Sequence, residues 1–181
     1  MRYVSIDLET TGLDPSYCQI LEVGMVEDDL EHPEVPVSEL RTFHCYVTHD
    51  RIVGESFALA RNHEIIRRIS ECRAPYKYVN SEHLIVEMSW WLERIFCKVT
   101  VAGKNFSGFD ALFLAKLAGT WRWDRLHQRV LDPCSMYVRA SDLIPPNLQE
   151  CCNRAGIIKT VSHTAIDDAR LVVELIRRKY A

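Results

Sequence analysis

Residues 2–13 read RYVSIDLETTGL, and this stretch places two acids at the end of an apolar segment. Aromatic and β-branched residues favour a β-strand over residues 2–8, and residues 10–15 have the composition of a turn. Side chains two positions apart on a strand point the same way, so Asp7 and Glu9 project from one face. Neighbouring carboxylates repel each other unless a cation lies between them. The stretch therefore predicts an acidic site at the end of a strand.

This spacing alone is weak evidence, because Asp29 and Glu31 repeat it within a polar connection where solvated charges are expected. Asp7 differs because it ends an apolar strand and is followed by the turn.

A second polar segment, NFSGFD at residues 105–110, directly follows a short apolar strand expected at residues 99–102. The ends of strands, where a helix begins, are common places for sites in α/β proteins. Asp110 falls in the first turn of the next expected helix, where it is also compatible with a simple partner of the helix dipole. Asn105 is equally compatible with an ordinary turn residue.

The third segment, HTAIDD at residues 163–168, places a histidine on a loop and an aspartate five positions later on a helix. His127 and Asp132 share this spacing, but no polar loop surrounds His127. We expect the long amphipathic helix to bring Asp168 against the sheet. Asp167 is rotated by about 100° around the helix and is expected to face solvent.

The order of the elements predicts a mixed α/β sheet covered by helices, within one domain spanning residues 1–181. The expected strands are residues 2–8, 19–26, 40–48, 99–102 and 129–131, and the expected helices are residues 57–70, 81–96, 109–118, 133–140, 147–155 and 165–180. Within these, Ser81 has the character of an N-cap, Gly156 suits the end of a helix, and residues 71–80 are expected to form a loop.

Composition excludes several classes of protein. The chain has 181 residues, of which 48% are hydrophobic and 26% charged, with a net charge of −3. Proteins that coat nucleic acid are usually basic, so tight binding to long duplex is disfavoured, although a site holding one chain end through cations remains compatible. No apolar run reaches the ~18–20 residues of a membrane span, and the N-terminus lacks a secretory signal. We therefore expect a cytoplasmic protein without membrane contact.

The seven cysteines contain no C-x-x-C pair, so we expect reduced thiols that act mostly as small core residues. His44, Cys45 and His49 faintly resemble a metal cluster, but they lie in an expected strand, which favours a structural role. The tryptophans at positions 90, 91, 121 and 123 are expected in the core rather than at an interface.

Taken in order, SIDLETTGLDP, KNFSGFDALFL and HTAIDDA span residues 5–169 and resemble the DEDDh branch of the proofreading-type, DnaQ-like exonuclease superfamily. The last of the three resembles the endings of RNase T and oligoribonuclease. The resemblance implies a ribonuclease H-like five-stranded mixed sheet flanked by helices. Residues 28–100 resemble no motif.

The resemblance also implies a 3′–5′ exonuclease that releases nucleoside 5′-monophosphates from the 3′ end of single-stranded DNA or RNA. It implies that Asp7, Glu9, Asp110 and Asp168 hold two divalent cations, Mg²⁺ or Mn²⁺, for which oxygen ligands are suited, with His163 as general base. The implied substrate-binding residues are Thr10, Leu13, Asn105, Phe106 and Phe109. A homodimer is expected by the same likeness. Two alternatives remain, namely a ribonuclease H-type endonuclease and a non-catalytic module that binds nucleic-acid ends.

Overall fold

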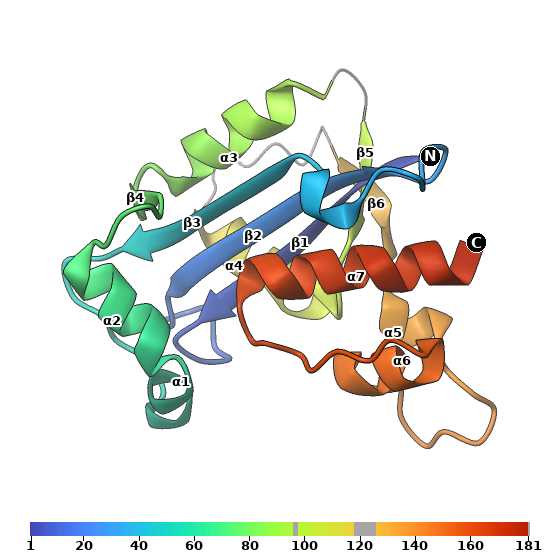
Figure 1. Cartoon of the computed structure of the whole chain (residues 1–181). Helices are drawn as coiled ribbons and strands as arrows, with labels where there is room; N and C mark the ends of the chain where they lie inside the picture. The colour runs from blue at the N-terminus through green and yellow to red at the C-terminus, as the bar shows by residue number, and fades with distance from the viewer. Residues whose placement is uncertain (96–97, 118–125, 181) are drawn as a thin grey trace.

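The chain is built on one mixed β-sheet, shown in Figure 1. The structure, a computed structural model, describes residues 1–95, 98–117 and 126–180. The strands are β1 (Arg2–Thr10), β2 (Ile20–Asp29), β3 (Thr42–Thr48), β4 (Tyr78–Asn80), β5 (Val99–Ala102) and β6 (Leu126–Leu131). Their spatial order is β4-β3-β2-β1-β5-β6.

Helices cover both faces of this sheet. They are α1 (Ser56–Arg61), α2 (His63–Glu71), α3 (Leu84–Glu93), α4 (Asp110–Leu117), α5 (Pro133–Met136), α6 (Leu148–Ala155) and α7 (Ala165–Tyr180), with short 3₁₀ turns η1 (Val37–Glu39) and η2 (Phe106–Gly108). In Figure 1, α7 crosses one face of the sheet, and α3 and α4 lie on the other.

The strand pairing confirms the expected mixed α/β class. β1, β2 and β3 form an antiparallel meander, whereas β5 and β6 join β1 in parallel. The sheet has six strands rather than five. The additional strand is β4, which lies in the segment expected to be a loop and pairs in parallel with β3. Val79 is its buried residue, and three residues are too few for an alternating pattern to be visible in the sequence.

Three helix boundaries differ from expectation. The helix expected over residues 57–70 is divided at Asn62 into α1 and α2. The buried side chain of Asn62 donates a hydrogen bond to the Thr10 carbonyl. Ser81 is not the N-cap of α3, because that helix begins after His83. The helix expected at residues 133–140 is only the four residues of α5.

The remaining helix ends agree with the sequence where the structure describes them. The side chain of Asn147 accepts a hydrogen bond from the amide of Glu150 at the start of α6. Gly156 ends that helix with a φ of 69°, the left-handed geometry that glycine adopts without a Cβ clash. The expected ends at residues 96 and 118 lie outside the described residues.

Strand β1 divides its side chains between two cores. Val4, Ile6 and Leu8 pack toward α3 and α4, whereas Tyr3 packs with α7. Asp7 and Glu9 continue the α7-facing register of Tyr3. Alternation along one strand therefore directs both acids to the side of the sheet that carries α7.

Helix α7 approaches the sheet most closely at its first turn. A Cβ atom at Gly24 on β2 would lie 2.3 Å from the carbonyl carbon of Ala165, so only glycine permits this contact. Asp168 follows three residues after Ala165 on the buried side of α7 and is 5% exposed. Asp167 is exposed, as expected.

The cysteines and tryptophans are placed as follows. Six cysteines are described; all have free thiols, and each except Cys72 is buried. Trp91 packs against the core and its indole donates to the Thr42 carbonyl, whereas Trp90 is exposed, so the core placement expected of it is wrong. Cys97, Trp121 and Trp123 lie outside the described residues. Among the helices described, none is long and apolar enough to cross a membrane.

Candidate active site

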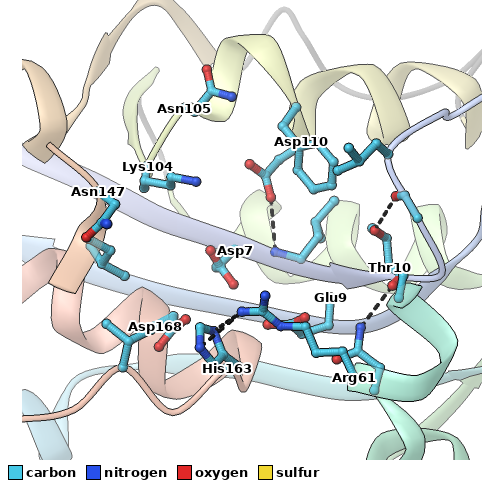
Figure 2. Close-up of a pocket in the computed structure, with 18 of the residues that line it drawn as sticks. Asp7, Glu9, Thr10, Arg61, Lys104, Asn105, Asp110, Asn147, His163 and Asp168 are labelled. Carbon is cyan, nitrogen blue, oxygen red and sulfur yellow. Dashed lines mark hydrogen bonds between the residues drawn. The ribbon is translucent and has the colours of Figure 1, made fainter. Parts of the chain in front are cut away.

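Three acids from two distant parts of the sequence meet at the end of β1. One carboxylate oxygen from each of Asp7, Glu9 and Asp168 can be chosen so that all lie within 4.8 Å of one another. Figure 2 shows the β1 acids and Asp168 of α7 pointing into one space. In the described part of the chain, this is the only such cluster of three or more potential metal ligands.

The fourth predicted acid, Asp110, reaches the same space from the first turn of α4. Its Oδ1 accepts a hydrogen bond from the amide of Leu8 at 3.0 Å, and the residue is 3% exposed. Asp110 lines the same cleft as Asp7, and its charge is among the causes that raise the pKa of Asp7. The structure thus brings all four predicted carboxylates to one site.

The electrostatics of this site disfavour four ionised acids without a counter-charge. Burial, followed by the charges of Asp110 and Glu9, raises the pKa of Asp7 well above its usual range. Burial raises the pKa of Glu9 to about 8, that of Asp110 to about 7 and that of Asp168 to about 6. A bound cation would reverse these shifts, because it favours the charged form of each neighbour.

The donor set fits a hard divalent cation. Asp168 Oδ1 is buried and has no hydrogen-bond partner, so a ligand atom is available inside the cluster. Carboxylate oxygens are the ligands that Mg²⁺ and Mn²⁺ prefer. A further buried acid, Glu22 on β2, pairs in register with Glu9 and adds its charge to the site. These observations are what a cation-binding cluster requires.

His163 lies on the loop that leads into α7 and lines the same cleft. Its φ of 56° is unusual for a residue other than glycine, and such strain is often found at functional sites. Burial and the neighbouring Arg61 guanidinium lower the pKa of its imidazole. His127 is exposed on β6 and does not line the cleft. The structure therefore places His163, and not His127, beside the acids.

The cleft has a volume of about 810 Å³ and is lined by four of the five residues expected to bind substrate. These are Thr10, Leu13, Asn105 and Phe109. Leu13 is 74% exposed at the rim, and the Thr10 hydroxyl donates to the Gly12 carbonyl at 2.7 Å. Phe106 is placed differently, because it is 3% exposed in the core next to α4 and does not line the cleft. Its expected contact with substrate is therefore wrong.

Sequence patterns missed several lining residues. Arg61, Asn62 and Glu55 come from a segment without any recognisable motif, and Lys104 and Asn147 flank expected elements. Glu22 could have been found, because it is a lone acid within the apolar strand ILEVGMV.

Comparisons with known proteins agree with this geometry. The family model described as "Exonuclease" (RNase_T) matches residues 4–176. None of the curated proteins compared with the sequence matches it.

Among solved structures, exonuclease I of Methylocaldum szegediense superposes with a TM-score of 0.73 at 16% identity, over 98% of this chain and 40% of that one. E. coli exonuclease I in complex with a dT13 oligonucleotide superposes with a TM-score of 0.71 at 16% identity, over 97% and 40% of the two chains. A zinc-bound form of an E. coli exonuclease I complex with single-stranded DNA gives 0.71 at 14% identity, over the same shares. The chain spans about two fifths of the length of these proteins and shares their fold.

Proposed function

Because the chain belongs to the exonuclease family, whose model covers residues 4–176, we propose that it hydrolyses phosphodiester bonds from the 3′ end of single-stranded nucleic acid. The product is a nucleoside 5′-monophosphate. We propose that residues 1–181 act as one catalytic domain.

One observation carries the proposal. Asp7, Glu9, Asp110, His163 and Asp168 are spread over about 160 positions of sequence, yet their side chains line a single cleft. Two buried and two half-buried acids in one cleft are unfavourable without a ligand, so their convergence supports a site for cations and a charged substrate.

The four acids would hold two divalent cations, Mg²⁺ or Mn²⁺. When bound, these cations supply charge that offsets acid and phosphate repulsion, activates a water molecule and stabilises the leaving oxygen. The zinc-bound neighbour supports cation binding at this fold.

We assign His163, which lines the same cleft as the acids, to take the proton of the attacking water. The water oxygen forms a bond to phosphorus, the bond from phosphorus to the 3′ oxygen breaks, and that oxygen leaves and acquires a proton. The lowered pKa of His163 favours the neutral imidazole near pH 7, which is the form able to accept a proton.

The substrate end would lie over the rim of the cleft. The exposed Leu13 presents an apolar surface to the last base, while Thr10, Asn105 and Phe109 line the space behind it. An unpaired base reaches such a surface more easily than a stacked one, which favours single strands. Neighbours solved with dT13 and dA16 oligonucleotides support single-stranded DNA as a substrate.

A labelled-end assay tests the proposal. The purified chain should shorten 5′-labelled single-stranded DNA stepwise in Mg²⁺ or Mn²⁺, and single-stranded RNA in parallel reveals its preference. Asp7→Asn or Asp168→Asn should abolish turnover, because each removes a charged ligand, and excess EDTA should stop the reaction. Asp167→Asn is the matched control, since Asp167 is the exposed neighbour of Asp168 and pairs with Thr164.

Full activity of Asp168→Asn, or turnover in chelator, would contradict the assignment. A circular single-stranded substrate distinguishes the alternatives: cleavage indicates an endonuclease, and no turnover of any substrate indicates a binding module. The expected homodimer stays a prediction that sedimentation of the purified chain tests.

A further inference from the structure

Arg61, the last residue of α1, stands in the cleft beside the candidate general base. Its Nη2 atom lies 2.6 Å from Nδ1 and 3.0 Å from Nε2 of His163. Dashed lines in Figure 2 mark these contacts. The charge of Arg61 partly offsets the rise in the pKa of Glu9. Arg61 lines the same cleft as the acids and is exposed, so a ligand can reach its guanidinium.

Both ends of α1 are fixed to the end of β1. At the start of the helix, the amide of Glu55 donates to the Thr11 carbonyl at 2.8 Å. At its end, the side-chain amide of Asn62 donates to the Thr10 carbonyl at 2.9 Å. These contacts set the position of Arg61 by the backbone of the sheet rather than by a free loop.

The guanidinium has hydrogen-bonding capacity to spare. Among the described residues, its side chain has no hydrogen-bond or ion-pair partner except His163, although five carboxylates line the same cleft. Arginine presents five N–H donors in a fork that matches two phosphate oxygens. The other Lys or Arg among the lining residues is Lys104, whose charge partly offsets the rise in the pKa of Asp110.

We propose that Arg61 binds the phosphate of the terminal linkage and, until a substrate arrives, covers the ring nitrogens of the otherwise exposed His163. The proposal rests on the proposed exonuclease function. A phosphate carries negative charge and can accept two parallel hydrogen bonds from a guanidinium, whereas a neutral imidazole has one acceptor nitrogen, so a phosphate draws the guanidinium away from His163. His163 is then free to accept the proton of the water. Arrival of the substrate and exposure of the base are coupled through one side chain.

The covering contact can be tested without turnover. In metal-free protein, diethyl pyrocarbonate should modify His163 several-fold faster in Arg61→Gln than in the wild type, with the exposed His32 as internal reference. Arg67→Gln is the matched control, because Arg67 lies on α2 in an ion pair with Glu64 outside the cleft. Equal rates at His163 in wild type and Arg61→Gln would overturn the covering role.

Phosphate binding is tested with a single-stranded oligonucleotide whose last linkage is a neutral methylphosphonate. Measured by fluorescence anisotropy in EDTA, the wild type should bind the native oligonucleotide about 10-fold more tightly than the neutral one, as expected for a charged hydrogen bond. Arg61→Gln should bind the two equally, and Arg61→Lys should retain part of the difference. In Mg²⁺, Arg61→Gln should raise KM more than it lowers kcat.

A merely structural role for Arg61 would lower stability without removing the discrimination between the two linkages, and that result refutes the inference. If Arg61→Gln does not fold, Arg61→Lys still tests the discrimination between the two linkages, because lysine keeps the positive charge but lacks the forked N–H donors of the guanidinium. An inactive wild type refutes the proposed function instead, so the two failures are distinguishable.

Discussion

Replacing Asp110 by asparagine is expected to stabilise the metal-free protein while removing its activity. Asp110 is 3% exposed, and burial raises the pKa of its carboxyl from an ordinary 3.8 to about 7. An acid whose pKa is higher in the folded state binds more protons when folded. Stability is therefore greatest below pH 4 and is lost progressively as the pH rises toward 7. Asparagine does not ionise, so the variant does not lose this stability as the pH rises. Its Oδ1 atom still accepts the hydrogen bond from the amide of Leu8.

The size of the effect follows from the pKa of Asp110. A difference of about 3 pH units at 1.36 kcal/mol each gives about 4 kcal/mol at pH 8, and about 2 kcal/mol at pH 5. For a domain of this size, 1 kcal/mol corresponds to roughly 2–4 °C in Tm, so the expected rise at pH 8 is about 8–16 °C.

The assay is thermal unfolding followed by circular dichroism in EDTA at pH 8 and pH 5. Asp142→Asn is the opposing control, because hydrogen bonds from Arg154 lower the pKa of Asp142 to about 2 and its loss should destabilise the protein at both pH values. Added Mg²⁺ should raise the Tm of the wild type more than that of Asp110→Asn, since a ligand of the folded state stabilises it.

A lower Tm for Asp110→Asn at pH 8 in EDTA would refute the reasoning. So would a difference between variant and wild type that stays constant from pH 5 to pH 8, because ionisation of this carboxyl would then contribute nothing.

Three other substitutions have definite expected outcomes. His163→Ala should lower kcat by about 10²–10⁴, the usual contribution of a general base, and change the pH–rate profile, while calorimetry shows cation binding retained. Leu13→Ala should raise KM for single strands roughly 10-fold with an unchanged Tm, because this exposed side chain has up to about 1.5–3 kcal/mol of burial to gain from a base. Arg177→Met should lower the free energy of unfolding in urea by about 3–5 kcal/mol, since it leaves the buried charge of Asp28 without its cationic partner and with only the hydroxyl of Tyr3 bonded to it, and the neighbouring Arg178→Met should have little effect.

Local rules were sufficient to predict those parts of the site that lie on regular elements. Alternation along β1 gave Asp7 and Glu9 a common face, and helical geometry distinguished Asp168 from Asp167. The segment HTAIDD also has the correct order of loop and helix, because a long amphipathic pattern leaves little freedom in where α7 begins.

Local rules failed where a contact across the chain decides the structure. β4 exists because β3 offers an edge to pair with, and the break at Asn62 exists because its side chain bonds the end of β1. Arg61 ends a helix of six residues with no motif, and only that break and the anchored start of α1 place it against His163. Phe106 was misplaced because an aromatic residue within a polar segment suits a pocket and a core equally well.

The fold and the site place opposing demands on the same strand. One face of β1 buries Val4, Ile6 and Leu8, whereas the other face gathers acids whose charges raise one another's pKa. The charge of Glu22 increases that repulsion. His44 contacts the Oε1 atom of Glu22, whereas no described residue forms a hydrogen bond with its buried Oε2 atom. A carboxylate that serves only packing would be replaced by an apolar side chain at lower energetic cost. The presence of Glu22 beside Glu9 is explained by a bound cation, because every nearby negative charge stabilises the cation even without direct contact. The repulsion among the acids of the metal-free protein is then a free energy that the cation recovers on binding.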